Sequence, residues 1–317
     1  MSDPFLLPPR SVVSFSGGRT SGYMLWRVLQ AFGGTLPDDR RVIFCNTGKE
    51  REETLEFVER CSQRWGVPVT WLEYRWEPGR KYFVEVDFAS ASRDGEPFKL
   101  LIQSRKMLPN KTMRFCTIDL KLRPSNRYVR QILGWKEYMN AIGFRHDEPK
   151  RIAKLEGEKK SSQVYAKLFE EFDQDEPEER DYLPGETPFC PLDVAKITKP
   201  MILDWWARND FDLRLEEGEG NCDLCFLKGG AILVKLMEKR PADAAWWIER
   251  ERERERELSE RAMTLRKRRF ALFDARRPSY EGLLAIAQGK DDGPGWLWAD
   301  GKQNRSCGEM AECRCTD

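Results

Sequence analysis

The sequence between residues 11 and 144 alternates between strand-like and helix-like patterns. Short apolar runs predict strands at 11–15, 41–47, 68–74 and 137–144. Stretches with helical apolar spacing predict helices at 21–32, 52–66 and 116–133, the last interrupted at Pro124. Strands separated by helices of this length form a parallel sheet covered on both faces. The sequence therefore predicts an α/β fold with a doubly wound, Rossmann-like parallel sheet that binds ligands at the carboxyl ends of its strands.

The rest of the chain departs from this alternation. Residues 75–113 do not fit it and predict an excursion over the sheet edge or the site. Residues 156–186 are acidic and poor in apolar residues, which favours an insertion or linker. Apolar helical stretches follow, around a cysteine-rich turn. We therefore expect an α/β domain at 1–155, the acidic insertion or linker at 156–186, and a mainly helical, cysteine-rich C-terminal region at 187–317.

Charge and hydropathy predict where the protein is located and which partners it lacks. The 54 Lys and Arg nearly balance the 53 Asp and Glu, so the net charge of +1 predicts no global attraction to nucleic acid or membranes. No apolar run approaches the roughly 20 residues of a membrane-spanning helix, and the N-terminal stretch lacks the pattern of a secretory signal. We expect a cytoplasmic protein with no membrane partner, whose nine cysteines are thiols or metal ligands and not disulfides.

The stretch SFSGGRTS at 14–21 joins the first predicted strand to the first predicted helix. Adjacent glycines let the backbone approach a ligand, and a helix N-terminus presents N–H groups to an anion. The alternative is a tight turn in which Ser16 or Ser21 caps the helix. Neither GxxxxGK[ST] nor GxGxxG is present. A phosphate-binding role would therefore belong to another class of loop.

The cysteines fall into groups. Cys222 and Cys225 form a CxxC pair, a spacing that lets two thiolates reach one metal or, alternatively, form a redox pair. Cys45 and Cys61 occupy apolar positions of a predicted strand and helix, where we expect buried small hydrophobes. The only histidine is His146, which excludes a histidine-rich zinc centre.

Four further motifs follow the loop in order. They are NTG at 46–48 with EETLEFV behind it, RFCTIDLKLRP at 114–124, GFRHDEP at 143–149, and PLDVAKITK followed by NCDLCFLKG. With SGG-x-x-S at 16–21, they resemble the motifs of the adenine-nucleotide alpha-hydrolase superfamily, the PP-loop ATP pyrophosphatases, in its phosphoadenosine phosphosulfate (PAPS) reductase-like branch. The resemblance covers most of the chain and implies a PP-loop nucleotide-binding domain at 1–155.

The resemblance also implies which residues bind the nucleotide. They are Ser14, Ser16, Gly17, Gly18, Arg19, Thr20, Ser21, Asn46, Thr47, Gly48, Gly143 and Arg145. Arg145 suits a phosphate clamp because its fork is planar and permanently charged, and Lys121 and Arg114 are further anion ligands. The alternative for Arg145 is a salt bridge to Asp147 or Glu148. We assign catalytic roles to Arg145 and Lys121.

A metal centre is implied in the same way. The family brings the helix that begins near Cys116 close to its metal centre, so Cys116 joins Cys222 and Cys225 as a predicted ligand. We assign the fourth position to Cys315, with Cys190, Cys307 and Cys313 as alternatives. Four thiolates fit a [4Fe–4S] cluster, which the resemblance favours, or a zinc ion. Three of these four ligands lie in the region 187–317, which we therefore expect to bind the metal.

Three functions remain open. The first is an enzyme that cleaves ATP to AMP and pyrophosphate and so activates an acceptor for sulfur transfer or a related modification. Its acceptor would be tRNA, DNA or a small molecule, and its partner a sulfur-donor protein. The second is reduction of PAPS to sulfite by a thiol. The third is a non-catalytic nucleotide-binding subunit of a modification complex. Retention of Gly18 favours ATP, whereas Thr20 replaces the Asp that ATP-using members carry at their Mg²⁺–phosphate site.

Overall fold

The computed structural model describes residues 3–155, 185–216, 218–260 and 271–297. Its centre is a six-stranded sheet in the order β4-β3-β2-β1-β5-β6. The strands are β1 (Ser11–Ser14), β2 (Arg40–Asn46), β3 (Val69–Glu77), β4 (Arg80–Val86), β5 (Tyr138–Ala141) and β6 (Glu186–Phe189). All neighbouring strands are parallel except β3 and β4. The predicted doubly wound α/β fold is confirmed.

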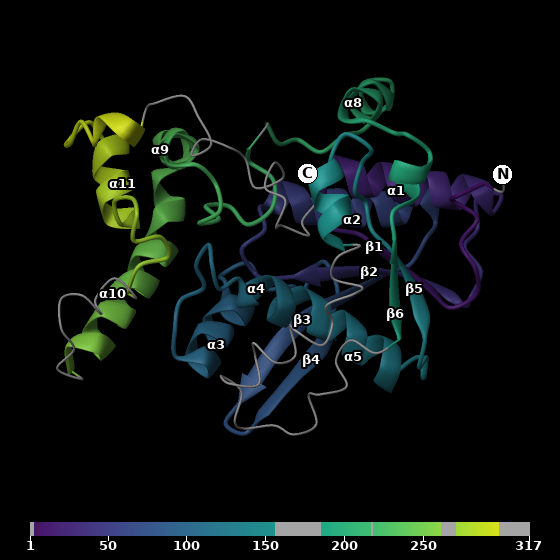
Figure 1. The fold of residues 1–317 in the computed structure, drawn as a ribbon, viewed down its shortest axis with the longest axis horizontal. Coiled ribbons are helices and arrows are strands. Elements are labelled where there is room, and N and C mark those ends of the chain that lie inside the picture. Colours follow the sequence, from purple (N-terminus) through teal and green to yellow (C-terminus); the bar gives the residue numbers. More distant parts are fainter. Residues whose placement is uncertain (1–2, 156–184, 217, 261–270, 298–317) are drawn as a thin grey trace.

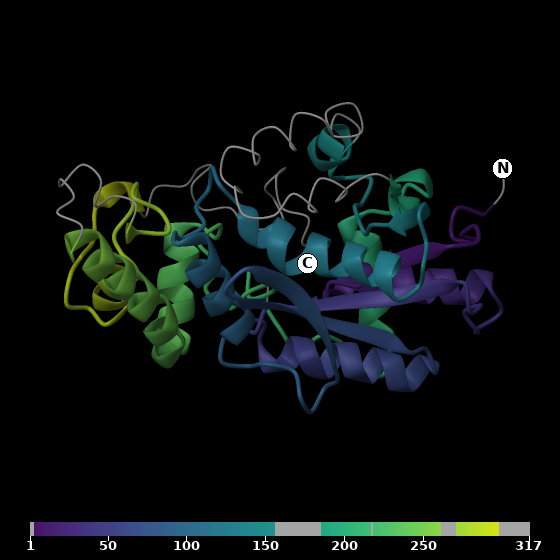
Figure 2. The same ribbon diagram turned by 90° about the horizontal axis from the view of Figure 1, so that it is seen from below.

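Helices cover both faces of this sheet (Figures 1 and 2). On one face lie α1 (Arg19–Ala31) and α2 (Glu52–Trp65), with α8 (Lys199–Ala207) packed outside α1. On the other face lie α3 (Glu96–Arg105), α4 (Phe115–Thr117), a π-helical turn (Ile118–Leu122) and α5 (Arg123–Gln131). Successive strand residues point to opposite faces. Val13 therefore joins the core under α1 and α2, and Val12 joins the smaller core under α5.

The C-terminal helices form a second core beyond the carboxyl ends of the parallel strands (Figure 1). They are α9 (Gly230–Lys239), α10 (Ala244–Glu260) and α11 (Tyr280–Ala287), which build this core together with α3. The short helix α7 (Pro191–Val194) packs instead in the core under α1 and α2 through Leu192. A buried ion pair between Lys49 Nζ and Asp223 Oδ2, 2.9 Å long, joins the second core to the loop after β2. The predicted mainly helical C-terminal region is present. No helix in the described ranges is long and apolar enough to cross a membrane.

The structure differs from the sequence-based expectation at three places. Residues 80–86 of the expected excursion form β4, an antiparallel strand at the sheet edge. Residues 186–189 add β6 beside β5, so the sheet continues past the last strand we expected and past the boundary at 155. Pro124 does not interrupt a helix. It lies in the first turn of α5, where its missing N–H is not needed, and the irregularity is the π-helical turn before it.

Candidate nucleotide-binding site

The loop between β1 and α1 is shaped by Gly17. Its φ is +77°, and an added Cβ would lie 2.6 Å from Cγ2 of Thr54. Gly18 precedes α1 with an ordinary extended φ of −98°. The turn therefore requires glycine at position 17, because both its conformation and its packing against α2 exclude a side chain.

Hydrogen bonds of Ser16 and Ser21 connect the two ends of this loop. Ser21 Oγ lies 2.9 Å from Ser16 Oγ, accepts a hydrogen bond from the Ser16 backbone N–H, and donates one to the carbonyl oxygen of Gly18. No described side chain caps the first turn of α1. Helix-start N–H groups that lack a side-chain cap are groups to which anions typically bind.

Arg19 and Thr20 occupy different surroundings. The Arg19 guanidinium is bidentate to Asp212, at 2.8 and 2.8 Å, and donates to the carbonyl oxygens of Leu213 and Leu215. Its side chain is thereby committed to the segment after α8, which leaves its backbone as the group that can face the ligand. Thr20 is buried, and its Oγ1 accepts a hydrogen bond of 3.1 Å from Arg145 Nη1.

Arg145 forms the salt bridges that were the alternative considered from the sequence, whereas its role as a phosphate clamp stays a prediction. It follows β5, is 7% exposed, and pairs with Asp147 at 3.0 Å and Glu148 at 3.4 Å. The same guanidinium reaches the loop through Thr20. The two carboxylates fix the planar fork, and the fork ties the end of β5 to the β1–α1 turn.

A pocket lies at the point where the strand order reverses. β1 pairs with β2 on one side and with β5 on the other, and such switch points are where open α/β sheets bind ligands. The pocket lies between the sheet and the α4–α5 segment. Its lining residues are Ser14, Phe15, Ser16, Ile43, Cys45, Thr117, Lys121, Leu122, Ser125, Tyr138, Asn140, Ile142, Gly143 and Glu186. Of the predicted site residues, Ser14, Ser16, Lys121 and Gly143 line this pocket, and the lining does not include Gly17, Gly18, Arg19, Thr20, Ser21 or Arg145.

Asn46, Thr47 and Gly48 do not line this pocket. Asn46 is fully buried and donates to Glu73 Oε1 and the Ser92 carbonyl oxygen, at 2.6 and 2.8 Å. Thr47 donates from both its N–H and its hydroxyl to Glu50 Oε2. Buried polar groups need partners, and here the protein itself supplies them. These residues stabilise the β2–α2 loop, which we had assigned to nucleotide contact.

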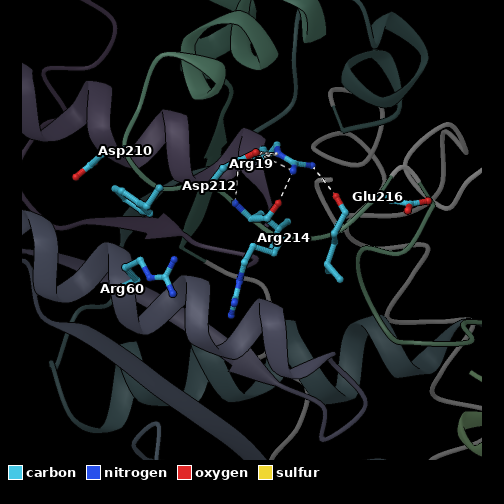
Figure 3. A pocket seen from close by; sticks show the side chains of 9 residues that line it. Arg19, Arg60, Asp210, Asp212, Arg214 and Glu216 are labelled. Carbon is cyan, nitrogen blue, oxygen red and sulfur yellow. Dashed lines mark hydrogen bonds and ion pairs between the residues drawn. The ribbon is translucent and has the colours of Figure 1, made fainter.

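A larger hollow, of about 500 Å³, lies elsewhere and is not the predicted site (Figure 3). It is bounded by Arg19, Arg60 and the segment 210–216. Its charges are matched within the protein, because Arg19 pairs with Asp212 and Arg214 pairs with Glu56. A phosphate group would have to displace these carboxylates. The narrower pocket, which Ser14 and Ser16 of the loop line, is therefore the candidate site.

The predicted metal ligands are only partly brought together. Cys116, Cys222 and Cys225 pack in the same core cluster, and burial, followed by the nearby Glu50 and Cys225, raises the pKa of Cys222 well above its usual value. Cys116 begins the helical segment that carries Lys121. No three His, Cys, Asp or Glu side chains within the described parts of the chain form a group that could hold a metal. Cys307, Cys313 and Cys315 lie outside the described residues.

The other cysteines pack in cores. Cys190 is buried with Ile142, Phe144 and Leu155, in a cluster separate from the CxxC pair. Burial raises the pKa of Cys45 to about 12, and it raises the pKa of Cys61 further. Cys45 and Cys61 are therefore thiols at neutral pH, as expected of small hydrophobes.

Sequence reasoning missed three polar residues at this site. Asn140 and Glu186 line the pocket, and Glu50 lies 3.9 Å from Lys121 Nζ. Asn140 carried a usable signal, because it is a polar residue within an apolar strand. Glu186 carried none, since it follows a long acidic stretch and only its pairing with β5 brings it to the pocket.

Comparison with known proteins gives three findings. Residues 10–211 match the family model described as phosphoadenosine phosphosulfate reductase domain. The chain is 30% identical over 224 residues to the uncharacterized nin region protein ORF290 of Escherichia phage lambda, which covers 69% of this chain and 66% of that protein, just under two thirds of its length. The U34-tRNA thiolase NcsA from Methanococcus maripaludis, solved with its [4Fe-4S] cluster, is similar over 97% of this chain and 79% of that chain, at a TM-score of 0.40 and 12% identity. The family match spans the whole sheet and the pocket.

Proposed function

This chain belongs to the phosphoadenosine phosphosulfate reductase domain family, within the adenine-nucleotide alpha-hydrolase superfamily, and from that premise we propose that it is an ATP-cleaving enzyme. It would split ATP into AMP and pyrophosphate and use the AMP to activate an acceptor for sulfur transfer or a related modification. The acceptor would be tRNA, DNA or a small molecule, served by a sulfur-donor protein.

The observation that carries the proposal is the arrangement around Gly17. Ser14 and Ser16, just before this glycine, line one pocket with Lys121 at the reversal of the strand order, and the turn leads directly into the uncapped start of α1. Arg145 holds the loop through Thr20. Backbone N–H groups and fixed cations in such a place bind the phosphates of a nucleotide.

The chemistry follows from these groups. An acceptor oxygen attacks the α-phosphorus, the bond from that phosphorus to the bridging oxygen breaks, and pyrophosphate leaves. The helix start and the loop hydroxyls stabilise the negative charge that grows on the leaving group, and Lys121 adds a cation beside it. A sulfur nucleophile then displaces AMP from the acceptor. Mg²⁺ would accompany the triphosphate and neutralise part of its charge.

We propose a metal centre on Cys222 and Cys225, with Cys116 and Cys315 completing the ligand set. The CxxC spacing supports it, as does the packing of Cys116, Cys222 and Cys225 in one core cluster. These four thiolates would hold a [4Fe–4S] cluster or, in its place, a tetrahedrally coordinated zinc ion. Since no three ligands converge in the described residues, we derive no reaction step through this centre.

Arg145→Ala is expected to weaken ATP binding about tenfold to hundredfold, since hydrogen bonds to charged groups contribute about 1.5–3 kcal/mol. Calorimetric titration of ATP, with and without Mg²⁺, measures the effect. Thr20→Val removes the same contact but leaves Arg145 paired with its carboxylates, and it should lower the affinity in the same direction. Arg208→Ala is the control, because Arg208 pairs on the surface with Asp204. Unchanged ATP affinity in both site variants would contradict the proposed role of the loop.

The reaction itself separates the three functions. Anaerobically purified protein is incubated with ATP and, separately, with PAPS and a thiol reductant. We expect AMP and pyrophosphate from ATP, with turnover increased when the true acceptor is added. Sulfite from PAPS that disappears in Cys307→Ser would establish the reductase instead. Nucleotide binding without either product, in the presence of candidate tRNA, DNA and small-molecule acceptors, would favour the non-catalytic subunit.

The metal proposal has its own test. Anaerobic preparations are expected to be brown and to contain iron, and Cys222→Ala should remove most of it because thiolates are the ligands. Cys190→Ala is the matched control, since Cys190 is buried in a different cluster. Elemental analysis and visible absorption measure the outcome. If the protein contains one zinc and no iron, the centre is a zinc site and not a cluster. If Cys222→Ala keeps its full metal content, the ligand assignment is refuted.

A further inference from the structure

The nucleotide pocket has ends of opposite charge. Ser16, Lys121 and Gly143 lie at the end beside the glycine loop. Glu186 lies at the other end, because β6 pairs it with Tyr138, the first residue of β5. At roughly 3.3 Å per residue, the backbone of Glu186 lies about 10 Å before the carboxyl end of β5, and its carboxylate reaches back as far as Asn140. A bound molecule that spans the pocket therefore meets a cation and helix N–H groups at one end and a carboxylate at the other.

The carboxylate is held in place by a chain of hydrogen bonds. Ser14 Oγ donates to Asn140 Oδ1 at 2.7 Å, and Asn140 Nδ2 donates to Glu186 Oε1 at 2.9 Å. The Tyr138 hydroxyl donates a hydrogen bond of 3.5 Å to Glu186 Oε2. Asn140 is buried, so its amide is fixed, and it must turn its donor to Glu186 because an ionised carboxylate only accepts.

We propose that Glu186 is a specificity-determining residue, which admits an adenine nucleotide with free ribose hydroxyls and rejects one with a 3′-phosphate. The inference rests on the proposed function, since it assumes that the 5′-phosphates bind the glycine loop. With the phosphates there, the nucleoside extends toward Glu186. A ribose hydroxyl can donate to the carboxylate. A 3′-phosphate would bring a group of three terminal oxygens that share a negative charge toward it, in a partly buried place where charges are weakly screened.

The inference selects between the two nucleotides considered for this family. ATP has a 3′-hydroxyl, whereas PAPS has a 3′-phosphate. Glu186 therefore favours ATP by a physical argument that is separate from the glycine loop. The preference for a free 3′-hydroxyl arises at the nucleoside end of the pocket. It should therefore also appear with nucleotides that carry a single 5′-phosphate.

The test compares AMP with adenosine 3′,5′-bisphosphate, which differ only in the 3′-phosphate, and uses ATP as a third ligand. Calorimetric titration of the full chain is expected to show AMP binding at least tenfold more tightly than the bisphosphate. Glu186→Gln, which keeps the shape and removes the charge, should reduce this preference about tenfold. Glu186→Asp keeps the charge and should retain the preference. Glu137→Gln, at an exposed neighbouring position, is the control and should not change the ratio.

The outcomes separate the two proposals. If the wild-type protein binds ATP, and binds AMP and the bisphosphate with equal affinity, the role of Glu186 is overturned and the proposed function is left intact. The same conclusion follows if Glu186→Gln binds AMP with an unchanged preference. Absence of binding by all three nucleotides would overturn the proposed function together with this inference. The wild-type comparison needs no variant, so it decides the matter even if Glu186→Gln does not fold.

Discussion

Gly17→Ala is expected to lower the free energy of unfolding by about 2–5 kcal/mol and to weaken ATP binding at least tenfold. A non-glycine residue at positive φ costs about 1–2 kcal/mol, and overpacking a filled core costs about 1–3 kcal/mol. Both apply here, because φ is +77° and the new Cβ would lie 2.6 Å from Thr54 and 3.2 Å from Val58. Relief of that clash moves the loop away from α2, and the N–H groups at the helix start move with it.

Gly33→Ala is the matched control for this prediction. Gly33 also has a positive φ, of +69°, but no atom lies within 4 Å of the added Cβ. It should therefore lose only the conformational part of the stability and bind ATP normally. Chemical denaturation and calorimetric titration measure the two quantities for both variants. Equal stability losses at the two positions, with ATP affinity preserved at both, would show that the packing of Gly17 against α2 does not shape the loop.

Asp119→Asn is expected to cost about 3–5 kcal/mol, the range found when one partner of a buried ion pair is removed. Asp119 is fully buried in the π-helical turn that carries Lys121. It accepts from Arg105 at 2.9 and 3.1 Å and pairs with Arg123 one helical turn later. Without its charge, two buried guanidinium groups lose their counterion.

The loss should extend to nucleotide binding, because the turn that Asp119 holds also positions Lys121 in the pocket. Urea denaturation gives the stability, and titration with ATP gives the affinity. Asp204→Asn removes an exposed carboxylate that pairs with Arg208 and should change neither. A stability loss in Asp119→Asn as small as that of the control would contradict the counterion role.

Much of the α/β architecture was predictable because it is encoded locally. The apolar runs at 11–15, 41–47, 68–74 and 137–144 correspond to β1, β2, β3 and β5. The two strands that were missed are edge strands. β4 is rich in charged residues, which suits a strand that faces solvent. β6 has only four residues and contains Pro188, so little in its own sequence marks it as a strand.

The candidate site was predictable in its loop and less so in its partners. Ser14 and Ser16 from the start of the loop line one pocket with Lys121 and Gly143. Asn46 and Thr47 are instead engaged within the β2–α2 loop. Cys190 packs in a core cluster separate from that of the CxxC pair. The nucleotide contacts and the metal ligands themselves stay predictions.

The sequence by itself determined the order of strands and helices and the position of the sharp turn at Gly17, because periodicity and glycine act on neighbouring residues. Only the tertiary structure decided the partners of the long polar side chains. Arg19 turns to Asp212, and Arg145 reaches Thr20 across 125 positions of the chain. Glu186 reaches the pocket through β6. A flexible charged side chain pairs with whatever group folding brings within reach, and no local pattern records which group that is.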